Sequence, residues 1–242
     1  MGQNDPRDVT KPASQPVSRK AEIDAFLNQA RSLGPRSDGG RGRLVFALDA
    51  TMSRQPTWDM ACKLQAEMFE ETAAVGGLDV QLVYFRGMSE CAASRWVSDP
   101  KRLAGLMQKI GCAGGQTQIC RMLDHVAKES KTRKVHALVF VGDCMEEAID
   151  EVCTAAGKLG LMGVPVFVFQ EGSDPVAERA FKEIARLTKG AWCPFDAGAA
   201  HQLRELLRAA AAYAAGGYKA LSDLSRRKGG EGVTRLLGQM RS

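Results

Sequence analysis

Three oxygen-bearing side chains follow an apolar segment of the chain at alternating positions. Residues 44–48 are all apolar, and Asp49, Thr51 and Ser53 come directly after them. These three side chains cannot all face one point if the extended segment continues, because a strand spreads every second residue along its length. In a tight loop just past a strand they can converge and present one carboxylate and two hydroxyls to a hard cation.

Two further stretches place an oxygen-bearing side chain at the start or the end of an expected element. Thr117 follows the glycine pair 114–115 and opens an amphipathic helical pattern, and Asp143 comes directly after the segment 139–142. With the first group, this makes five oxygen ligands on three loops. Mg²⁺ and Mn²⁺ suit such a set because they bind carboxylate and hydroxyl oxygens, keep several waters and accept few protein ligands. The residues therefore predict a Mg²⁺ or Mn²⁺ site.

Strand and helix patterns alternate along the chain from residue 43. Apolar runs predict strands at 44–48, 78–85, 95–97, 135–141, 164–169 and 191–194. Apolar residues at helical spacing predict helices at 56–75, 100–110, 117–130, near 146–159, 176–188 and 199–214. This alternation predicts an open, doubly wound α/β fold, with a mostly parallel six-stranded sheet and helices on both faces.

The expected sheet brings Asp49 and Asp143 to the same edge. Both residues follow buried strands, and in an open α/β sheet ligands bind outside the carboxyl ends of the strands, where the strand order reverses. If the two strands are neighbours at that reversal, Thr117 can close the third side of the site.

At these residues the chain resembles the von Willebrand factor A (VWA) domain family. The metal-ion-dependent adhesion site (MIDAS) of that family is written D-x-S-x-S, followed by a Thr on a Gly-rich loop and an Asp after a later strand. Asp49, Thr51 and Ser53 match the first motif, Thr117 matches the second and Asp143 the third. The resemblance implies that the three hydroxyls would touch the metal directly and that the two acids would hold it mainly through waters. A carboxylate from a binding partner would complete the octahedron.

Two positions depart from the residues that are usual in this family. Thr51 stands where Ser is usual, which keeps the hydroxyl but adds a methyl group and stiffens χ1. Cys144 follows Asp143 where Gly is common. Neither change removes a ligand of the implied site.

The resemblance also implies a non-enzymatic, intracellular protein-interaction module that captures an acidic residue of a protein partner. Among bacterial intracellular members of the family, partners are often AAA+ ATPases or other complex subunits. Two alternatives stay open. Asp49 could be the nucleophile of a metal-dependent phosphatase of the haloacid dehalogenase type, although Thr51 stands where that class has its general acid and cannot perform that role at neutral pH. The other alternative is a VWA scaffold without metal, in which the fold and a basic tail bind the partner.

Composition indicates one domain with two tails. We expect a disordered N-terminus, a short helix and a linker at 1–42, a VWA-like domain at 43–214 and a basic, flexible tail at 215–242. The seven cysteines include no C-x-x-C pair and favour reduced thiols, and no signal peptide or apolar run of about 20 residues is visible, so we expect a cytoplasmic protein. The net charge of +5 is too small to indicate a nucleic-acid partner.

Three further acids are expected at helix N-termini rather than at the metal. Glu146 and Glu147 lie at the start of the helix expected near 146–159, where the helix dipole favours negative charge. Asp174 precedes Pro175 and should cap the next helix.

Overall fold

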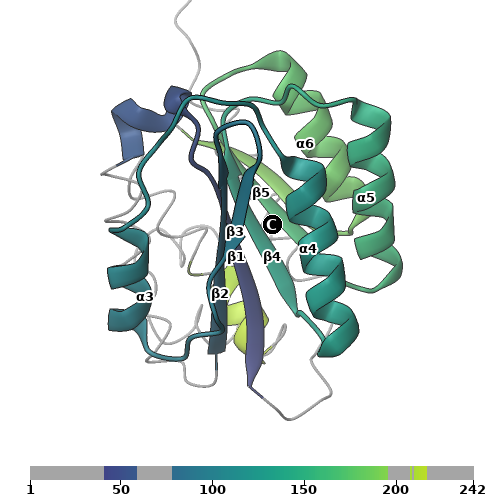
Figure 1. Ribbon diagram of the computed structural model, residues 1–242. Coiled ribbons are helices and arrows are strands. Elements are labelled where there is room, and N and C mark those ends of the chain that lie inside the picture. The colour runs from purple at the N-terminus through teal and green to yellow at the C-terminus, as the bar shows by residue number, and fades with distance from the viewer. Residues whose placement is uncertain (1–40, 59–77, 196–207, 209, 217–242) are drawn as a thin grey trace, which may run out of the picture.

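The computed structural model describes residues 41–58, 78–195, 208 and 210–216. Within them, strands form a single sheet with helices packed against it (Figure 1). Most of the predicted N-terminal segment 1–42, of the helices at 56–75 and 199–214 and of the tail at 215–242 lies outside the described residues. The domain boundaries therefore stay predictions.

The sheet confirms the six-stranded, mostly parallel arrangement. Its strands are β1 (Gly42–Asp49), β2 (Leu78–Arg86), β3 (Glu90–Ala93), β4 (Ala137–Gly142), β5 (Val166–Glu171) and β6 (Ala191–Phe195). Their order is β3-β2-β1-β4-β5-β6, and every neighbouring pair is parallel except β2 and β3. Strands β1, β4 and β5 are buried along their whole length because helices cover both of their faces, which explains their apolar sequences.

The edge strand lies a few residues earlier than predicted. The chain turns back after β2 through Gly87, whose φ of 62° favours glycine, and β3 then pairs antiparallel with β2. The predicted strand at 95–97 contributes a single antiparallel bridge, between Val80 and Val97. The apolar pattern missed β3 because its four residues are exposed or half-buried, so that strand needs no apolar run.

Helices cover both faces of the sheet, as predicted. They are α3 (Pro100–Met107), α4 (Ile119–Thr132), α5 (Ile149–Leu161) and α6 (Pro175–Leu187), with a short 3₁₀ helix, η1 (Met52–Thr57), after β1. Helices α4, α5 and α6 pack on one face, and α3 and the helical residues 210–216 pack on the other (Figure 1). The residues of β1 alternate between the two layers: Leu44 and Phe46 face α3, and Val45 and Ala47 face α4.

Helix boundaries differ from the predictions by a few residues. Helix α3 ends at Met107 rather than at residue 110, and both α4 and α5 begin later than predicted. Asp174 caps α6 as predicted, because its Oδ1 accepts the backbone N–H groups of Val176 and Ala177 at 2.8 and 2.7 Å. Of the helices that the structure describes, none is both long enough and apolar enough to cross a bilayer.

The strand order reverses between β1 and β4. The chain continues from β1 to β2 on one side and returns as β4 on the other side of β1. Strands β1 and β4 are parallel and in register, with Leu48 beside Val141. Their carboxyl ends therefore lie together, at the upper end of the sheet in Figure 1, where an open α/β sheet binds its ligand.

Phe140 on β4 anchors the face that α4, α5 and α6 cover. It is fully buried, and its ring centroid lies 6.0 Å from that of Phe85 and 5.4 Å from that of Phe181. Phe140→Ala is expected to lower the free energy of unfolding by about 3–5 kcal/mol, because it removes a buried ring and leaves a cavity. Urea denaturation measures this change. The control Leu161→Ala alters a side chain that is 93% exposed and should cost less than about 0.5 kcal/mol. Equal losses in the two variants would contradict this account of the core.

Candidate metal centre

Asp49 ends β1 and is fully buried. Its Oδ1 accepts the backbone N–H of Thr51 at 2.8 Å, which holds the chain in a tight loop directly after the strand. Among the described residues, its Oδ2 is buried and has no hydrogen-bond partner. A buried carboxylate oxygen without a partner is costly, and a cation would satisfy it.

Thr51 and Ser53 lie on the loop after Asp49, and their hydroxyl groups are within hydrogen-bond distance of each other. Thr51 Oγ1 is 3.0 Å from Ser53 Oγ. Met52, between them, is 53% exposed to solvent. The alternating residues therefore converge past the strand end, as their spacing predicts.

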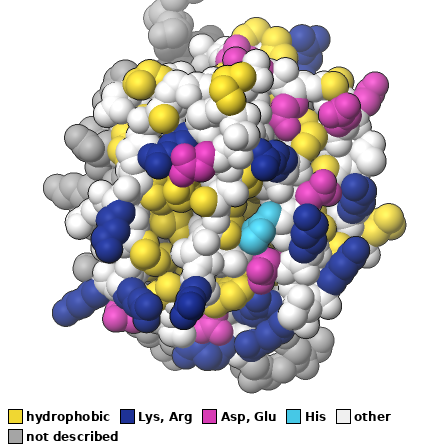
Figure 2. All heavy atoms as spheres, viewed as in Figure 1, with side chains coloured by type: hydrophobic (Ala, Val, Ile, Leu, Met, Phe, Trp, Pro, Cys, Tyr) yellow, Lys and Arg dark blue, Asp and Glu magenta, His cyan; other side chains and the backbone are white. Residues whose placement is uncertain are grey.

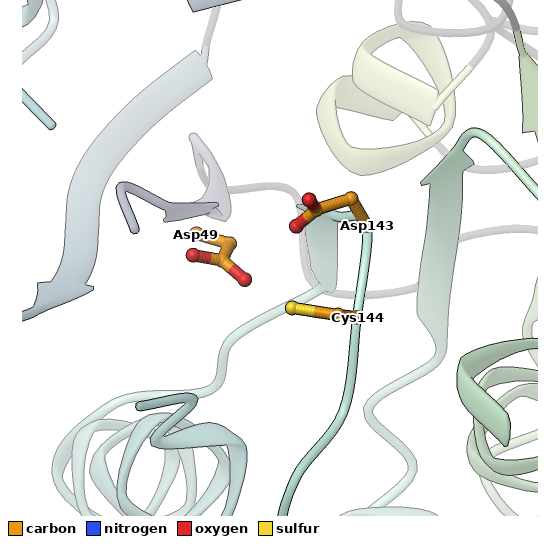
Figure 3. Close-up of side chains that lie close together, drawn as sticks. All are labelled: Asp49, Asp143 and Cys144. Carbon is orange, nitrogen blue, oxygen red and sulfur yellow. The ribbon is translucent and has the colours of Figure 1, made fainter. Parts of the chain in front are cut away.

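Asp143 and Cys144 follow β4, the neighbour of β1. One carboxylate oxygen of Asp49, one of Asp143 and the Sγ of Cys144 all lie within 4.8 Å of one another. Figure 3 shows the three side chains directed at a common gap. The Sγ of Cys144 is also 4.0 Å from Ser53 Oγ, so the thiol belongs to the same cluster as the hydroxyls. In the described part of the chain, Asp143 Oδ1 is buried without a hydrogen-bond partner.

Thr117 is held by the loop that follows β4. Its backbone N–H donates to Oε2 of Glu146 at 3.0 Å, and its Oγ1 accepts the backbone N–H of Glu146, also at 3.0 Å. A hydroxyl oxygen can accept two hydrogen bonds, so Thr117 Oγ1 keeps one lone pair for a further partner. Thr117 therefore lies beside the segment that carries Asp143.

The loop before α4 also contacts the loop after β1. Ala113 donates its backbone N–H to the carbonyl of Ala50 at 3.0 Å, and Gln116 donates to the carbonyl of Gly87 at 3.1 Å. Gly115 permits this close approach, because a Cβ there would lie 2.0 Å from the Gly87 carbonyl oxygen. Hydrogen bonds thus connect the three loops that carry the five predicted ligands at one edge of the sheet.

Glu147 caps α4 rather than the helix that follows it in the chain. Its Oε1 accepts the N–H of Cys120 at 2.8 Å and its Oε2 accepts the N–H of Ile119 at 2.5 Å. The prediction that Glu146 and Glu147 begin the helix near 146–159 is wrong: both bond residues at the start of α4, and α5 begins after them. Sequence spacing held no signal for these contacts, which join residues 27 to 29 positions apart.

A buried ion pair at the same edge was not anticipated from the sequence. Arg54 of η1 is 1% exposed, and its Nε lies 3.0 Å from Oε2 of Glu171 at the end of β5. An arginine in a polar loop is normally expected at the surface, so nothing in the sequence indicated that Arg54 is buried. Its charge favours ionisation of Asp49.

Burial and the neighbouring acids disfavour negative charge on Asp49 and Cys144. Burial, aided by the charge of Asp143, raises the pKa of Asp49 from 3.8 to about 6, against the opposing effects of the Thr51 hydrogen bonds and Arg54. Burial and the two carboxylates raise the pKa of the Cys144 thiol to about 12. A bound cation reverses such shifts, because it favours each anionic form. The unpartnered oxygens and the raised pKa of Asp49 fit a divalent cation.

Solved structures of known proteins share this fold. The chain superposes on a von Willebrand factor type A protein from Catenulispora acidiphila with a TM-score of 0.59 and 15% identity, over 72% of this chain and 43% of that chain. The SpRpn10 VWA domain matches with a TM-score of 0.57 and 9% identity, over 69% of this chain and 94% of that one. Proximal thread matrix protein 1 from the mussel byssus, with a zinc-occupied MIDAS motif, matches with a TM-score of 0.58 and 16% identity, over 71% and 46%.

These structural matches confirm a VWA-like fold. The sequence itself matches no protein-family model, and no curated protein is significantly similar to it. The chain spans less than half of the Catenulispora protein and of the mussel protein, and nearly all of the SpRpn10 domain. The likeness is therefore one of fold, and the chemistry must be argued from the residues of this chain.

Asp49→Asn is expected to stabilise the metal-free protein near neutral pH. The pKa of Asp49 is about 6 in the folded protein against its ordinary value of 3.8, so the folded state loses stability as the pH rises through this window. A shift of this size corresponds to at most about 3 kcal/mol. Urea denaturation with EDTA present should therefore show a gain of about 1–3 kcal/mol for the variant.

The same comparison at low pH provides the internal check. Below about pH 3 Asp49 is largely protonated in both the folded and the unfolded state, so the advantage of Asp49→Asn should disappear. The matched control Asp150→Asn changes an exposed acid at the start of α5 and should bring no gain. A variant no more stable than the wild type near neutral pH would contradict the cost assigned to the buried carboxylate.

Gly115→Ala is expected to destabilise the protein, whereas Gly114→Ala is not. A Cβ at position 115 would collide with the backbone of Gly87, and one at position 114 would meet no atom within 4 Å. The strain should cost about 1–3 kcal/mol of unfolding free energy in Gly115→Ala and leave Gly114→Ala within about 1 kcal/mol of the wild type. Chemical denaturation of the two variants side by side measures the difference. Equal stabilities would show that the loop before α4 is not held closely against the turn after β2.

Proposed function

We propose that this chain is a protein-interaction module that binds a divalent cation, Mg²⁺ or Mn²⁺, and uses it to capture an acidic residue of a partner protein. The proposed ligands are Asp49, Thr51, Ser53, Thr117 and Asp143. The observation that carries the proposal is the pair of buried carboxylate oxygens, one on Asp49 and one on Asp143, that have no hydrogen-bond partner among the described residues. Their side chains converge at the edge of the sheet where such folds bind ligands.

Hydrogen bonds position four of the five proposed ligands, and Asp143 is placed by the end of β4. The Thr51 N–H fixes the carboxylate of Asp49, the hydroxyls of Thr51 and Ser53 lie together, and Thr117 is fixed by Glu146. When bound, the cation would supply a positive charge at the edge of the sheet, and a carboxylate of the partner would be one of its ligands. The zinc-occupied MIDAS motif of the mussel byssus protein, which has the same fold, supports the assignment of the site.

A role in interaction rather than catalysis is supported by the burial of Asp49. As a phosphatase nucleophile this residue would need to reach a substrate, yet it is fully buried and one of its oxygens already accepts the Thr51 N–H. Thr51 cannot serve as a general acid at neutral pH. We therefore propose a non-enzymatic module, with an AAA+ ATPase or another complex subunit as the kind of partner that the family resemblance suggests. The scattered cysteines, which favour reduced thiols, support a cytoplasmic location.

Titration calorimetry of the metal-stripped protein tests the cation site. Mg²⁺ and Mn²⁺ are expected to bind at about one ion per chain, and Asp143→Ala should abolish binding because it removes one of the two unpartnered acids. The control Asp150→Ala removes an exposed acid of α5 and should bind as the wild type does. Absence of binding in the wild type, or undiminished binding in Asp143→Ala, would contradict the assigned site.

Selection from a random peptide library tests the capture of an acidic residue with the same proteins. Peptides retained by the immobilised wild type in Mg²⁺ or Mn²⁺ should be enriched in Asp and Glu and released by EDTA. The Asp143→Ala protein should retain none of this class. Retention that survives EDTA would instead favour a metal-free scaffold.

A further inference from the structure

The donor atoms of the candidate site include a thiol. Cys144 directly follows Asp143, and its Sγ lies within 4.8 Å of the nearest ligand oxygens of Asp49 and Asp143. Figure 3 shows the sulfur directed towards the gap between the two carboxylates. The same atom is 4.0 Å from the Ser53 hydroxyl, so it lies among the proposed oxygen ligands and not outside them.

The two acids beside this thiol have unmet bonding capacity. Asp49 is fully buried, and in the described part of the chain its Oδ2 has no hydrogen-bond partner, as is also true of Asp143 Oδ1. One carboxylate oxygen from each acid and the sulfur make a three-atom donor set. The other five cysteines that the structure describes belong to no comparable cluster of acids, thiols and histidines within the described residues.

The backbone next to Cys144 is fixed on both sides. Asp143 continues directly from β4, and Glu146 exchanges two hydrogen bonds with Thr117. Glu147 bonds the first two amides of α4. The cysteine side chain has one torsion, χ1, with three staggered positions, and the position in the structure places the sulfur near the carboxylates.

The chemistry of these donors distinguishes one divalent cation from another. Mg²⁺ demands oxygen ligands at about 2.0–2.1 Å, whereas Zn²⁺ binds cysteine sulfur at about 2.3 Å and carboxylate oxygen at about 2.0–2.2 Å. With these bond lengths, a tetrahedral zinc ion holds such donors about 3.4–3.6 Å apart. The donor atoms of this site all lie within 4.8 Å of one another, so zinc binding requires each pair to close by at most about 1.4 Å.

We propose that Cys144 is a ligand of the cation together with Asp49 and Asp143, and that the site consequently selects a thiophilic divalent ion, Zn²⁺, over Mg²⁺. This rests on the cation site proposed above and specifies which ion that site prefers. On binding, the S–H bond is replaced by a sulfur–metal bond and the proton passes to solvent, with no change of oxidation state. Thr51, Ser53 and Thr117 remain as oxygen donors for the positions that sulfur and the acids leave open.

Cobalt substitution tests this assignment directly. Co²⁺ occupies zinc sites, and a thiolate bound to it gives an intense sulfur-to-cobalt charge-transfer absorption that oxygen ligands do not give. Metal-stripped full-length wild type, Cys144→Ser and Cys153→Ser are titrated with Co²⁺. The control residue Cys153 is a half-buried cysteine of α5, outside the cluster. We expect the absorption in the wild type and in Cys153→Ser and its loss in Cys144→Ser.

Competition with a chromophoric chelator measures the ion preference. Zn²⁺ affinity should fall about tenfold or more in Cys144→Ser, while Mg²⁺ affinity, measured by calorimetry, should stay within about threefold of the wild-type value. Circular dichroism of Cys144→Ser and of a second variant, Cys144→Ala, establishes whether each variant keeps the fold.

The outcomes separate this inference from the function on which it rests. A cobalt complex without charge-transfer absorption, in a wild-type protein that binds Mn²⁺, would overturn the role of Cys144 and leave the cation site standing. If the sulfur-to-cobalt absorption or the Zn²⁺ affinity were unchanged in Cys144→Ser, the role of Cys144 would likewise be overturned and the cation site would stand. A wild type that binds none of these ions would overturn both proposals.

Discussion

Two carboxylates lie side by side at the edge of the sheet, each with a buried oxygen, and this is the constraint that the surrounding loops must satisfy. Within the described residues, Asp49 and Asp143 each have one oxygen without a hydrogen-bond partner. The charge of Asp143 raises the pKa of Asp49, and the charges of both acids raise the pKa of the Cys144 thiol. The buried guanidinium of Arg54, whose charge favours ionisation of Asp49, is paired with Glu171. The loops instead add hydroxyls and a thiol around the acids. Without a cation, such an arrangement of acids lowers the stability of the fold, and a bound cation would offset this cost.

The sheet and the loops divide the work of building this arrangement. Parallel pairing of β1 with β4 brings the two acids to one edge, because each follows the end of its strand. The loops then refine their positions through hydrogen bonds between segments distant in the chain. Thr117 and Glu146 bond each other reciprocally, and Glu147 closes the open end of α4. The loop that carries Asp143 therefore both caps the start of α4 and shapes the candidate site.

The features that could be predicted from the sequence are those set by local patterns. Apolar runs located five strands of the sheet, since burial on both faces of a strand leaves a continuous apolar run. Helical spacing of apolar residues located α3, α4, α5 and α6 to within a few residues. The acids of the site followed from the rule that strand ends meet. The short strand β3 left no such mark, because its residues are not buried. Two features depend on which segments meet in space: the pairing of Arg54 with Glu171 and the direction of the Cys144 side chain. Neither could be predicted from the spacing or the composition of the residues.

The reciprocal bonds between Thr117 and Glu146 join residues that are 29 positions apart, with the whole of α4 and β4 between them. Closing a loop of that length loses chain entropy, which is recovered only when the intervening helix and strand pack on the sheet. The candidate site is thus an outcome of completed folding. Its five-residue opening motif could not be grafted as a linear segment onto another protein, and a fragment lacking either α4 or β4 would carry the motif without the site.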